Sequence, residues 1–578
     1  NKLPYLINNP SDSSLKGQGK NLFYRDTILQ NKEIENIKFD LLIGNPPFGT
    51  TDLKESIRNY CDTHGFAKEM VLPFLHKATL FAPNGQIALI FNTKVLTNTG
   101  GTYMNFRKWL FNDCYVEKVY NFSILRKAPN DFGGQLFGDA TGPISIVFYQ
   151  KEQPQKPDDK IFYYAPKTYI RSNVIEGLTI DSTDVKYLPR EECQKPDTKI
   201  WKIAMWGGIN DWELLKRLND KYLTIKSFFT KENIDYGVGF ELSNPADKHN
   251  IEIKSLPIHT PNNIVKYYTP MPNEKIKSEK FRRLGKIEAY QTSHILLNEG
   301  VKVDENNLSL LVSYVDYKSA FSKGIVGIYS KNNNENLLKL LTVYLNSEFI
   351  RYYAFLTTSS WGIERDVIKY KEIFEAPFLI ESLDNKQKKY IVKQFDDKLF
   401  NKDFYTVNKY IEDELNKIIL DCLSENDRFI IQHIFSNIDL FHKQEKSIAL
   451  RPALHDQIRV YGKIISTEIN TFLQGQDLYA NATIYNINRF SPLMMIKLSF
   501  DKKHKEIVHT NEFVDDELKK LDQHLWEEKA TNIYFRKKLN YKTANNVYII
   551  RPNQRRFWSQ SMAMEDASEL ILEILNEK

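Results

Sequence analysis

The sequence predicts an α/β fold over its first 150 residues, because short apolar runs alternate there with amphipathic stretches. Residues 39–43 and 86–91 read as two buried strands, and glycine and proline residues end the first run and precede the second. Residues 66–81 lie between them and carry apolar side chains at helical spacing. Strands that alternate with helices form a mostly parallel sheet covered on both faces.

The rest of the chain divides by composition. At ordinary domain sizes, 578 residues correspond to three or four domains. We expect an α/β domain over residues 1–152, a linker over residues 153–199 that begins with two prolines, and an α+β domain over residues 200–380. Residues 381–578 form a helix-rich α+β domain, in which helical patterns are followed by strand-like runs and a final helix.

Composition limits the class of protein. Hydrophobic residues make up 42% and charged residues 26% of the chain, which indicates a globular protein. The net charge of +6 is compatible with a nucleic-acid partner but does not require one. The four cysteines have no zinc-ligand spacing, and no apolar run approaches the roughly 18 residues of a membrane span. We therefore expect a reduced, cytoplasmic protein with no metal site, no signal peptide and no contact with a membrane.

The tetrapeptide Asn45-Pro46-Pro47-Phe48 carries the strongest chemical signal. It directly follows the first predicted strand, at the sheet edge where open α/β sheets bind ligands. Asn45 offers a side-chain carbonyl and Pro46 a backbone carbonyl, and this pair can accept hydrogen bonds from an exocyclic amine. The prolines stiffen the loop, and Phe48 offers a face on which a flipped base can stack. The alternative is a rigid Pro-Pro turn with Phe48 in the core.

The nonapeptide from Asp40 to Phe48 resembles the catalytic motif of the adenine-N6 DNA methyltransferases, especially restriction–modification members with a fused target-recognition domain. Residues 66–92, 103–110 and 135–149 also match that pattern. The resemblance implies a Rossmann-like class I methyltransferase domain, S-adenosylmethionine as the methyl donor and flipping of the target adenine. Recognition after catalysis is the gamma-type order, so residues 1–152 would be catalytic and residues 200–380 would recognise the target.

The resemblance also assigns roles to two further residues. An aromatic residue near position 137 packs against the flipped adenine in this family, which makes Phe137 the base-stacking candidate. Phe132 is the alternative, and either could be an ordinary core residue. Asp26, in a segment that resembles the end of the family's preceding strand, is the candidate acceptor for the adenine of S-adenosylmethionine. A solvated aspartate in a turn explains Asp26 equally well.

Two family elements are not visible in the sequence, namely the glycine-rich loop after the first strand and the acidic residue that binds the cofactor ribose. Gly17-Gln18-Gly19 follows no strand and is flanked by serines and lysines, so we interpret it as an ordinary loop. We therefore expect an N-terminally incomplete methyltransferase domain with an exposed hydrophobic sheet edge that a partner segment covers. Otherwise another polypeptide supplies the missing half, or the domain is degenerate and only binds DNA.

Basic residues outside the catalytic domain are the candidates for contacts with DNA phosphates. The densest group lies at residues 275–286, where a solvated surface loop is the alternative interpretation. Residues 551–558 join three arginines to two aromatic residues and could instead form a packing corner. Asp516-Glu517-Leu518-Lys519 resembles one nuclease motif, but it lies in a helical stretch without a partner acid. The DNA-binding candidates are Arg282, Arg283, Lys286, Arg351, Arg555 and Arg556.

These observations predict a site-specific adenine DNA methyltransferase of a restriction–modification or phage-defence system. Its expected partners are double-stranded DNA and a restriction endonuclease or another defence-system subunit. The alternative is a DNA-recognition subunit with the same fold that needs another chain for cofactor binding. The large recognition-like region disfavours a methyltransferase that acts on RNA or protein.

Overall fold

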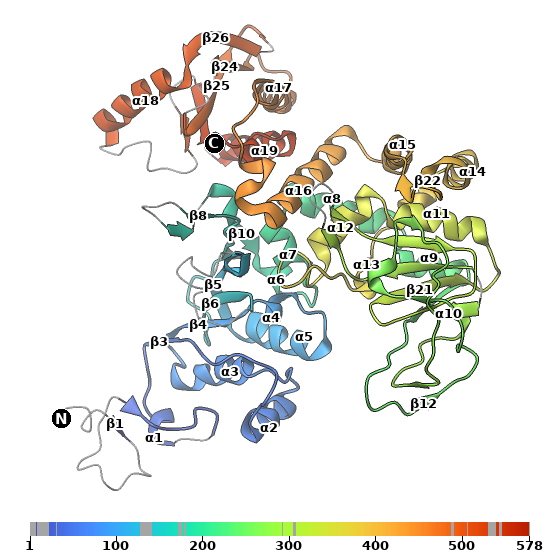
Figure 1. Cartoon of the computed structure of the whole chain (residues 1–578). Coiled ribbons are helices and arrows are strands. Elements are labelled where there is room, and N and C mark those ends of the chain that lie inside the picture. Colours follow the sequence, from blue (N-terminus) through green and yellow to red (C-terminus); the bar gives the residue numbers. More distant parts are fainter. Residues whose placement is uncertain are drawn as a thin grey trace. The chain divides into compact units, whose positions relative to one another are not determined.

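The computed structural model describes residues 7–8, 22–29, 32–127, 142–171, 176–178, 181–291, 293–303, 308–486, 491–505, 507–529, 539–542 and 546–576. The chain divides into two compact units, of which the first comprises Asn1–Pro166 and Thr183–Trp201 and the second Lys167–Ser182 and Lys202–Lys578. Figure 1 shows the course of the chain through both units.

A six-stranded sheet forms the centre of the first unit, in the order β10-β7-β5-β6-β4-β3. Its strands are β3 (Leu41–Gly44), β4 (Gln86–Asn92), β5 (Tyr115–Asn121), β6 (Ile144–Gln150), β7 (Lys160–Tyr164) and β10 (Val185–Pro189). The α/β class is confirmed. The sheet is mixed rather than mostly parallel, because β6 lies antiparallel between β4 and β5, while β3 pairs with β4 and β5 with β7 in parallel. Residues 153–199, expected to be a linker, supply β7 and β10.

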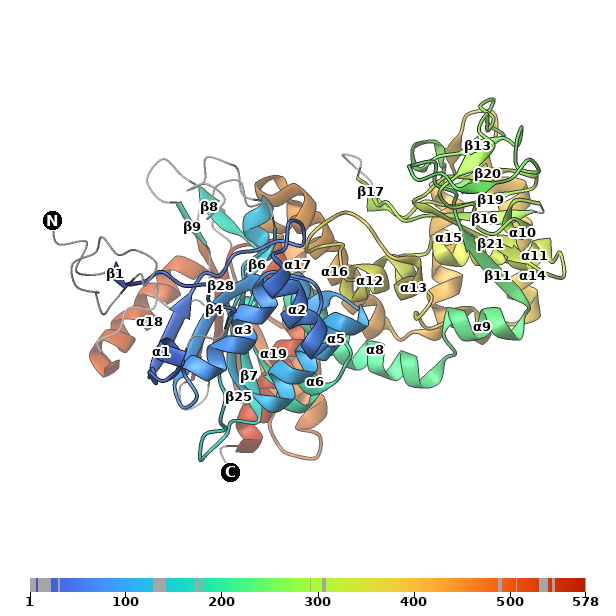
Figure 2. The ribbon, with the colours of Figure 1, turned by 90° about the horizontal axis from the view of Figure 1, so that it is seen from below.

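Helices cover this sheet and fix the start of β3. They are α1 (Lys32–Glu35), α2 (Glu55–His64), α3 (Val71–Phe81), α4 (Lys94–Thr97), α5 (Gly101–Lys108), which continues as a π-helix over Trp109–Asp113, and α6 (Arg190–Gln194). Figure 2 shows α3 along β4. The turn between them needs glycine, because a Cβ at Gly85 would lie 2.3 Å from the carbonyl oxygen of Phe39. Short strands β1 (Ile7–Asn8) and β2 (Leu22–Phe23) pair separately.

The strand β3 differs from the buried strand that the sequence predicts. Leu41 is 57% and Ile43 73% exposed. The reason is its position: β3 is the edge of the sheet, and within the described residues only β4 pairs with it. The apolar run therefore predicts the strand correctly but does not predict its burial. The same run is typical of a central strand and of an edge strand that another strand covers.

The second unit contains two five-stranded sheets. The first has the order β11-β21-β16-β19-β14 and the second β26-β24-β25-β28-β27. The first sheet comprises β11 (Ile234–Val238), β14 (Tyr267–Tyr268), β16 (His294–Asn298), β19 (Val312–Val315) and β21 (Ile325–Ser330). The second comprises β24 (Tyr479–Asn486), β25 (Leu493–Asp501), β26 (Ile507–Phe513), β27 (Leu539–Lys542) and β28 (Asn546–Pro552). Two-stranded pairs are β8 (Tyr169–Arg171) with β9 (Glu176–Leu178), β12 (Lys248–His249) with β15 (Lys280–Phe281), β13 (Ile258–His259) with β20 (Ala320–Phe321), β17 (Lys302–Val303) with β18 (Leu308–Ser309), and β22 (Phe400–Asn401) with β23 (Thr406–Val407).

The helices of the second unit begin at side-chain caps in several places. They are α7 (Lys199–Trp206), which starts in the first unit, α8 (Ile209–Lys221), α9 (Ile225–Lys231), α10 (Glu288–Gln291), α11 (Glu335–Leu345), α12 (Glu348–Thr357), α13 (Tyr370–Ile373), α14 (Asn385–Gln394), α15 (Lys409–Ile419), α16 (Glu425–Lys443), α17 (His455–Phe472), α18 (Val514–Lys529) and α19 (Gln560–Asn576). Residues 335–357 form two helices rather than one, because Ser347 caps α12 and Asn346 hydrogen-bonds Val312 of β19. None of the helices in the described part of the chain has the length and hydrophobicity to cross a bilayer.

Candidate active site and nucleic-acid interface

The Asn-Pro-Pro-Phe loop leaves the carboxyl end of β3, where Gly44 pairs with Leu89 in the middle of the parallel strand β4. Asn45 is exposed, Pro46 is buried and Phe48 is half-buried. A hydrogen bond fixes the end of the loop: the backbone N–H of Met70 donates to the carbonyl of Gly49 at 2.9 Å. Gly49 has a φ of +139°, a conformation that side-chain-bearing residues rarely adopt. The motif thus presents the Asn45 amide to solvent from a fixed loop.

A buried carboxylate stands next to this anchor. Glu69 is 0% exposed, accepts a hydrogen bond from the hydroxyl of Tyr103 at 2.6 Å and pairs with Lys94 Nζ at 3.1 Å. These contacts join the segment before α3 to α4 and α5. The sequence analysis missed these residues, because three side chains from three elements leave no local pattern.

A second polar network underlies the same sheet edge. The hydroxyl of Thr93, just after β4, lies 2.8 Å from that of Ser145 in β6 and accepts from Ser123 at 3.1 Å. Asn121, at the end of β5, donates to the hydroxyl of Tyr163 at 2.9 Å. All five residues are buried, so the network fixes the ends of β4 and β5 relative to each other. Phe137 and its alternative Phe132 lie outside the described residues.

Asp26 lines a pocket of about 310 Å³ beside β3. Its Oδ1 accepts from the backbone N–H of Ile28 at 3.0 Å, and Lys54 Nζ lies 3.8 Å from Oδ2. The pocket is lined by Phe23, Arg25, Asp26, Thr27, Ile34, Phe39, Leu41, Leu42, Ile43 and Phe81. Its walls are therefore mostly apolar, with one carboxylate and one guanidinium on the segment before α1.

Lys77 of α3 holds this segment in place. The side chain is only 4% exposed, and its Nζ donates to the carbonyls of Ile28 and Leu29 at 3.1 and 2.7 Å. It also pairs with Glu35 at 2.9 Å. A buried cation with these three acceptors is well compensated, and it couples the Asp26 segment to the helix that packs on β4. No group of three or more His, Cys, Asp or Glu residues in the described chain could hold a metal ion.

The structure brings Arg282, Arg283 and Lys286 together in the second unit. They line an open hollow of about 510 Å³ with Tyr236, Gly237, Val238, Lys248, Leu284, Gly285 and Tyr370. Two glycines allow β11 to touch the segment 285–286: a Cβ at Gly237 would lie 2.5 Å from Lys286 Cβ, and one at Gly285, where φ is +80°, would lie 2.3 Å from the Val238 carbonyl oxygen.

The three cations differ in how much charge they leave for a ligand. Arg283 donates through Nε and Nη2 to the carbonyl of Gly239 at 3.2 and 3.1 Å. Lys286 pairs with Asp235, and that hydrogen bond raises the pKa of Lys286. Arg282 has a side chain that is 52% exposed and lies 3.7 Å from Glu241. Arg282 is thus the best placed of the three to meet a phosphate.

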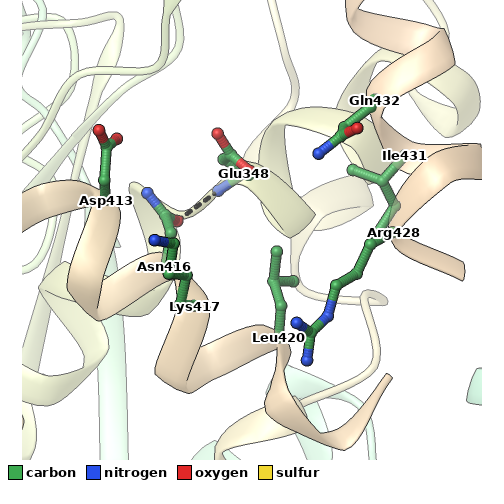
Figure 3. A pocket seen from close by; sticks show the side chains of 8 residues that line it. All are labelled: Glu348, Asp413, Asn416, Lys417, Leu420, Arg428, Ile431 and Gln432. Carbon is green, nitrogen blue, oxygen red and sulfur yellow. Dashed lines mark hydrogen bonds between the residues drawn. The ribbon is translucent and has the colours of Figure 1, made fainter. Parts of the chain in front are cut away.

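Arg351 is half-buried in a different environment. Its guanidinium stacks 4.1 Å above the ring of Phe435, and burial lowers its pKa. The neighbouring Glu348 lines a separate pocket of about 320 Å³, shown in Figure 3, where Asn416 accepts from the Glu348 backbone N–H. That pocket is lined by Glu348, Asp413, Asn416, Lys417, Leu420, Arg428, Ile431 and Gln432. Its two carboxylates are matched by two cations, Lys417 and Arg428, so the lining has no excess of positive charge for a DNA phosphate.

The two arginines near the end of the chain are also held internally. Arg555 is half-buried and donates to the carbonyl of Pro452 at 3.3 Å. Arg556 forms an ion pair with Asp181 at 2.5 Å, in which the side chains are 5% and 4% exposed. The guanidinium of Arg556 therefore joins segment 181–182 to the C-terminal region, and the DNA contact expected of Arg556 would require this buried ion pair to break.

Comparisons with known proteins place these features in context. Residues 1–126 match the family model of the Eco57I restriction-modification methylase. No match was found among curated proteins. Among solved structures, the type IIL restriction-modification enzyme MmeI in complex with DNA is similar at 12% identity over 70% of this chain and 57% of its own, with a TM-score of 0.40.

Two further structures show how much of the longer proteins is covered. The type IIG restriction endonuclease BpuSI aligns at 12% identity over 73% of this chain and 56% of its own, with a TM-score of 0.29. A type I methyltransferase subunit from Streptococcus thermophilus aligns at 17% identity over 30% of this chain and 39% of its own, with a TM-score of 0.24. The chain thus spans less than two thirds of each of these structures, and its first 126 residues are similar to a restriction–modification methylase.

Proposed function

We propose that the chain acts as a site-specific DNA methyltransferase of a restriction–modification or phage-defence system. Its substrate would be the exocyclic amino group of an adenine in duplex DNA. The observation that carries this proposal is the exposed Asn45-Pro46-Pro47-Phe48 loop at the carboxyl end of β3, inside the stretch that matches a restriction–modification methylase.

The residues of the loop suit an adenine that has left the base stack. The Asn45 side-chain carbonyl and the Pro46 backbone carbonyl would accept both N–H bonds of the amine. Such acceptors favour a pyramidal nitrogen, whose lone pair is then available for attack. Phe48 would stack on the base, and Phe137 is proposed as the ring on its other side. Because the loop is anchored through Gly49, the acceptors are already placed when the base arrives.

The pocket beside Asp26 is the proposed binding site for the adenine part of S-adenosylmethionine, which supplies the methyl group when it is bound. Apolar walls from Phe23 and Phe39 suit a purine, and the Asp26 carboxylate can accept from its amine. Lys77 would keep that carboxylate in register with β3 by holding the segment that carries it. The fit extends to the purine only, since the described lining residues include no loop for the methionine part.

For the recognition of DNA we propose residues 200–380, with Arg282, Arg283 and Lys286 as the phosphate-binding group. The exposed guanidinium of Arg282 supports this assignment most directly. Arg351 and Arg555, both half-buried, are proposed at the margin of the interface. The catalytic part would span residues 1–152, and a restriction endonuclease or another defence-system subunit would be a partner.

A second candidate function is favoured by the open edge of β3. The exposure of Leu41 and Ile43 fits a recognition subunit whose methyltransferase sheet is completed by another chain. The two candidates share the recognition region and differ in whether this chain transfers methyl groups without that partner.

Transfer of a radioactive methyl group from S-adenosylmethionine to plasmid DNA tests the proposal. We expect label in N6-methyladenine with the wild-type protein and roughly a 100- to 1000-fold lower rate with Asn45→Ala, by analogy with removing one hydrogen-bonding group from another enzyme's active site. Asn59→Ala is the matched control, because Asn59 is an exposed asparagine on α2, outside the tetrapeptide. If the wild type labels no adenine, or Asn45→Ala labels it equally, the proposed mechanism is wrong. Labelling that requires a second polypeptide would support the recognition subunit instead.

A further inference from the structure

A hairpin in the second unit carries aromatic side chains that nothing in the described structure covers. It consists of β22 and β23, and Figure 1 shows β22 between α14 and α15. Phe404 and Tyr405 at its tip are 74% and 58% exposed, and Tyr410 at the start of α15 is 78% exposed. Tyr410 and Phe404 are the two most exposed large hydrophobic side chains of the described residues.

The tip of the hairpin has a defined backbone. The side-chain oxygen of Asn401 accepts hydrogen bonds from the backbone N–H groups of Asp403 and Phe404 at 2.9 and 3.2 Å. Thr406 pairs with Asn401 across the hairpin, and Tyr405 adopts a positive φ of +50°. An Asx turn of this kind fixes the direction of the residues that follow it. Local hydrogen bonds therefore fix the backbone that carries the two rings.

The base of the hairpin is anchored in the body of the unit. Leu399 is fully buried, and the ring of Phe400 lies 6.3 Å from that of Tyr268, on the edge strand β14. Lys402 Nζ lies 4.0 Å above the same tyrosine ring. A firmly anchored hairpin that leaves two large rings in water is unusual for a surface without a ligand.

The charge around the hairpin identifies the class of ligand. Residues 385–410 contain seven lysines and three aspartates, a net charge of +4, and one of these lysines, Lys409, pairs with Glu412 at 2.6 Å. One of those aspartates, Asp396, is neutralised by Lys339 at 2.9 Å. Five of the exposed lysines lie on α14, on the π-helix Phe395–Leu399 that follows it and on the hairpin: Lys386, Lys389, Lys393, Lys398 and Lys402.

We propose that the β22–β23 hairpin is a second DNA contact, in which these lysines hold the phosphate backbone and Phe404 and Tyr405 stack against bases. Aromatic side chains provide stacking platforms for nucleobases, and apolar wedges insert between base steps in several DNA-binding proteins. This inference rests on the proposed function, because it takes DNA as the substrate. It adds a contact at the β14 edge of the sheet, whereas the Arg282 hollow involves β11 at the opposite edge. A protein partner would suit the rings, but a polyanion suits both the rings and the lysines.

The test is the binding of a fluorescent 40-base-pair duplex by Phe404→Ala/Tyr405→Ala at several salt concentrations. We expect roughly 5- to 150-fold weaker binding, from the worth of one to a few kcal/mol per stacked base, with an unchanged dependence on salt. Lys386→Gln/Lys389→Gln/Lys393→Gln should instead lower the slope of log K against log salt by about 0.9 for each phosphate that is no longer neutralised. Phe404→Tyr/Tyr405→Phe should bind as the wild type does.

Phe513→Ala is the matched control, because Phe513 is 47% exposed next to Glu512, in acidic surroundings. Its DNA affinity should not change. The inference is overturned if the hairpin variant binds the duplex as tightly as the wild type, or if it loses only binding to another protein or to a second copy. Methyl transfer separates the two proposals. If the wild type transfers methyl groups but the hairpin variant binds DNA as tightly as the wild type, only the hairpin contact is rejected. If the hairpin variant binds DNA more weakly but the wild type transfers no methyl groups, the proposed function is rejected.

Discussion

The edge strands β3 and β11 end their sheets in opposite ways. β3 of the first unit places Leu41 and Ile43 in solvent, and its four residues carry no charge. β11 of the second unit buries Ile234 to 6% exposure and carries Asp235, whose carboxylate pairs with Lys286 and, at 3.2 Å, with Lys331. Charged side chains on an edge strand prevent another strand from pairing with it.

The charged edge of β11 is therefore closed to a further strand, whereas the uncharged edge of β3 can accept one. On β11, the same ion pairs that block further pairing also shape the loops around the Arg282 hollow. On β3, the uncharged edge borders the pocket of Asp26, so a strand added there would also close one wall of the proposed cofactor site. A strand that pairs with the open edge of β3 would therefore also complete the proposed cofactor site.

Replacing one isoleucine on each edge strand should give the largest contrast. Ile234→Ala removes a buried side chain and should lower the free energy of unfolding by about 2–4 kcal/mol. Ile43→Ala, at a residue that is 73% exposed, should change it by no more than about 0.5 kcal/mol. Urea denaturation followed by circular dichroism measures both. Equal losses would show that β3 is covered in solution, and a loss at Ile43 that appears only with a partner polypeptide would identify its cover.

The parts of the fold that could be predicted are those with local signals. The strand before Asn45 has three consecutive apolar residues that are followed by glycine and two prolines, and Gly85 marks the turn where the backbone touches Phe39. The antiparallel insertion of β6 between β4 and β5 had no such signal, because strand direction depends on where the chain returns to the sheet. The exposure of β3 could not be read from its own apolar run, since it depends on which strand lies beside it, but it agrees with the exposed hydrophobic sheet edge that we expect for an incomplete domain.

For the candidate site the same limit applies to pairs of distant residues. Arg556 and Asp181 are separated by 375 positions, and Glu69 meets Tyr103 across 34. A run of arginines in the sequence cannot distinguish a guanidinium that faces a phosphate from one that neutralises a buried carboxylate. The residues of the Asn45 loop could be proposed from the sequence because they are contiguous, whereas the ion pair of Arg556 with Asp181 could not.

Buried lysines extend the comparison to the interior of the two units. Lys77 in the first unit pairs with Glu35, whereas Lys202 in the second donates to the backbone carbonyls of Thr358, at 3.0 Å, and Trp361. Burial lowers the pKa of Lys202 from 10.5 to about 7. Between these values the unfolded chain binds the proton and the folded chain does not, so stability should rise with pH in that window.

Lys202→Met tests this pH dependence. The difference in unfolding free energy between wild type and variant should grow in favour of the wild type by up to about 1.4 kcal/mol per pH unit above pH 7. Urea denaturation at pH 6, 7.5 and 9 measures the difference, and subtracting the variant removes the titration of other groups. A difference that stays constant over this range would show that Lys202 remains charged, with carbonyl dipoles sufficient to hold the cation.

Replacing a single arginine should give the smallest effect, a change in DNA affinity. It tests whether Arg282, beside the β11 edge strand, contacts a phosphate. Arg282→Ala should weaken duplex binding about three- to fivefold at low salt and lower the slope of log K against log salt by about 0.9, because one phosphate is no longer neutralised. Arg459→Ala is the matched control, since Arg459 on α17 has the same 52% side-chain exposure and also stands near a carboxylate, Asp456 at 3.6 Å. Fluorescence anisotropy between 50 and 200 mM salt resolves the two. If both variants lower the slope of log K against log salt equally, general surface charge governs DNA binding. Arg282 beside β11 would then make no specific phosphate contact.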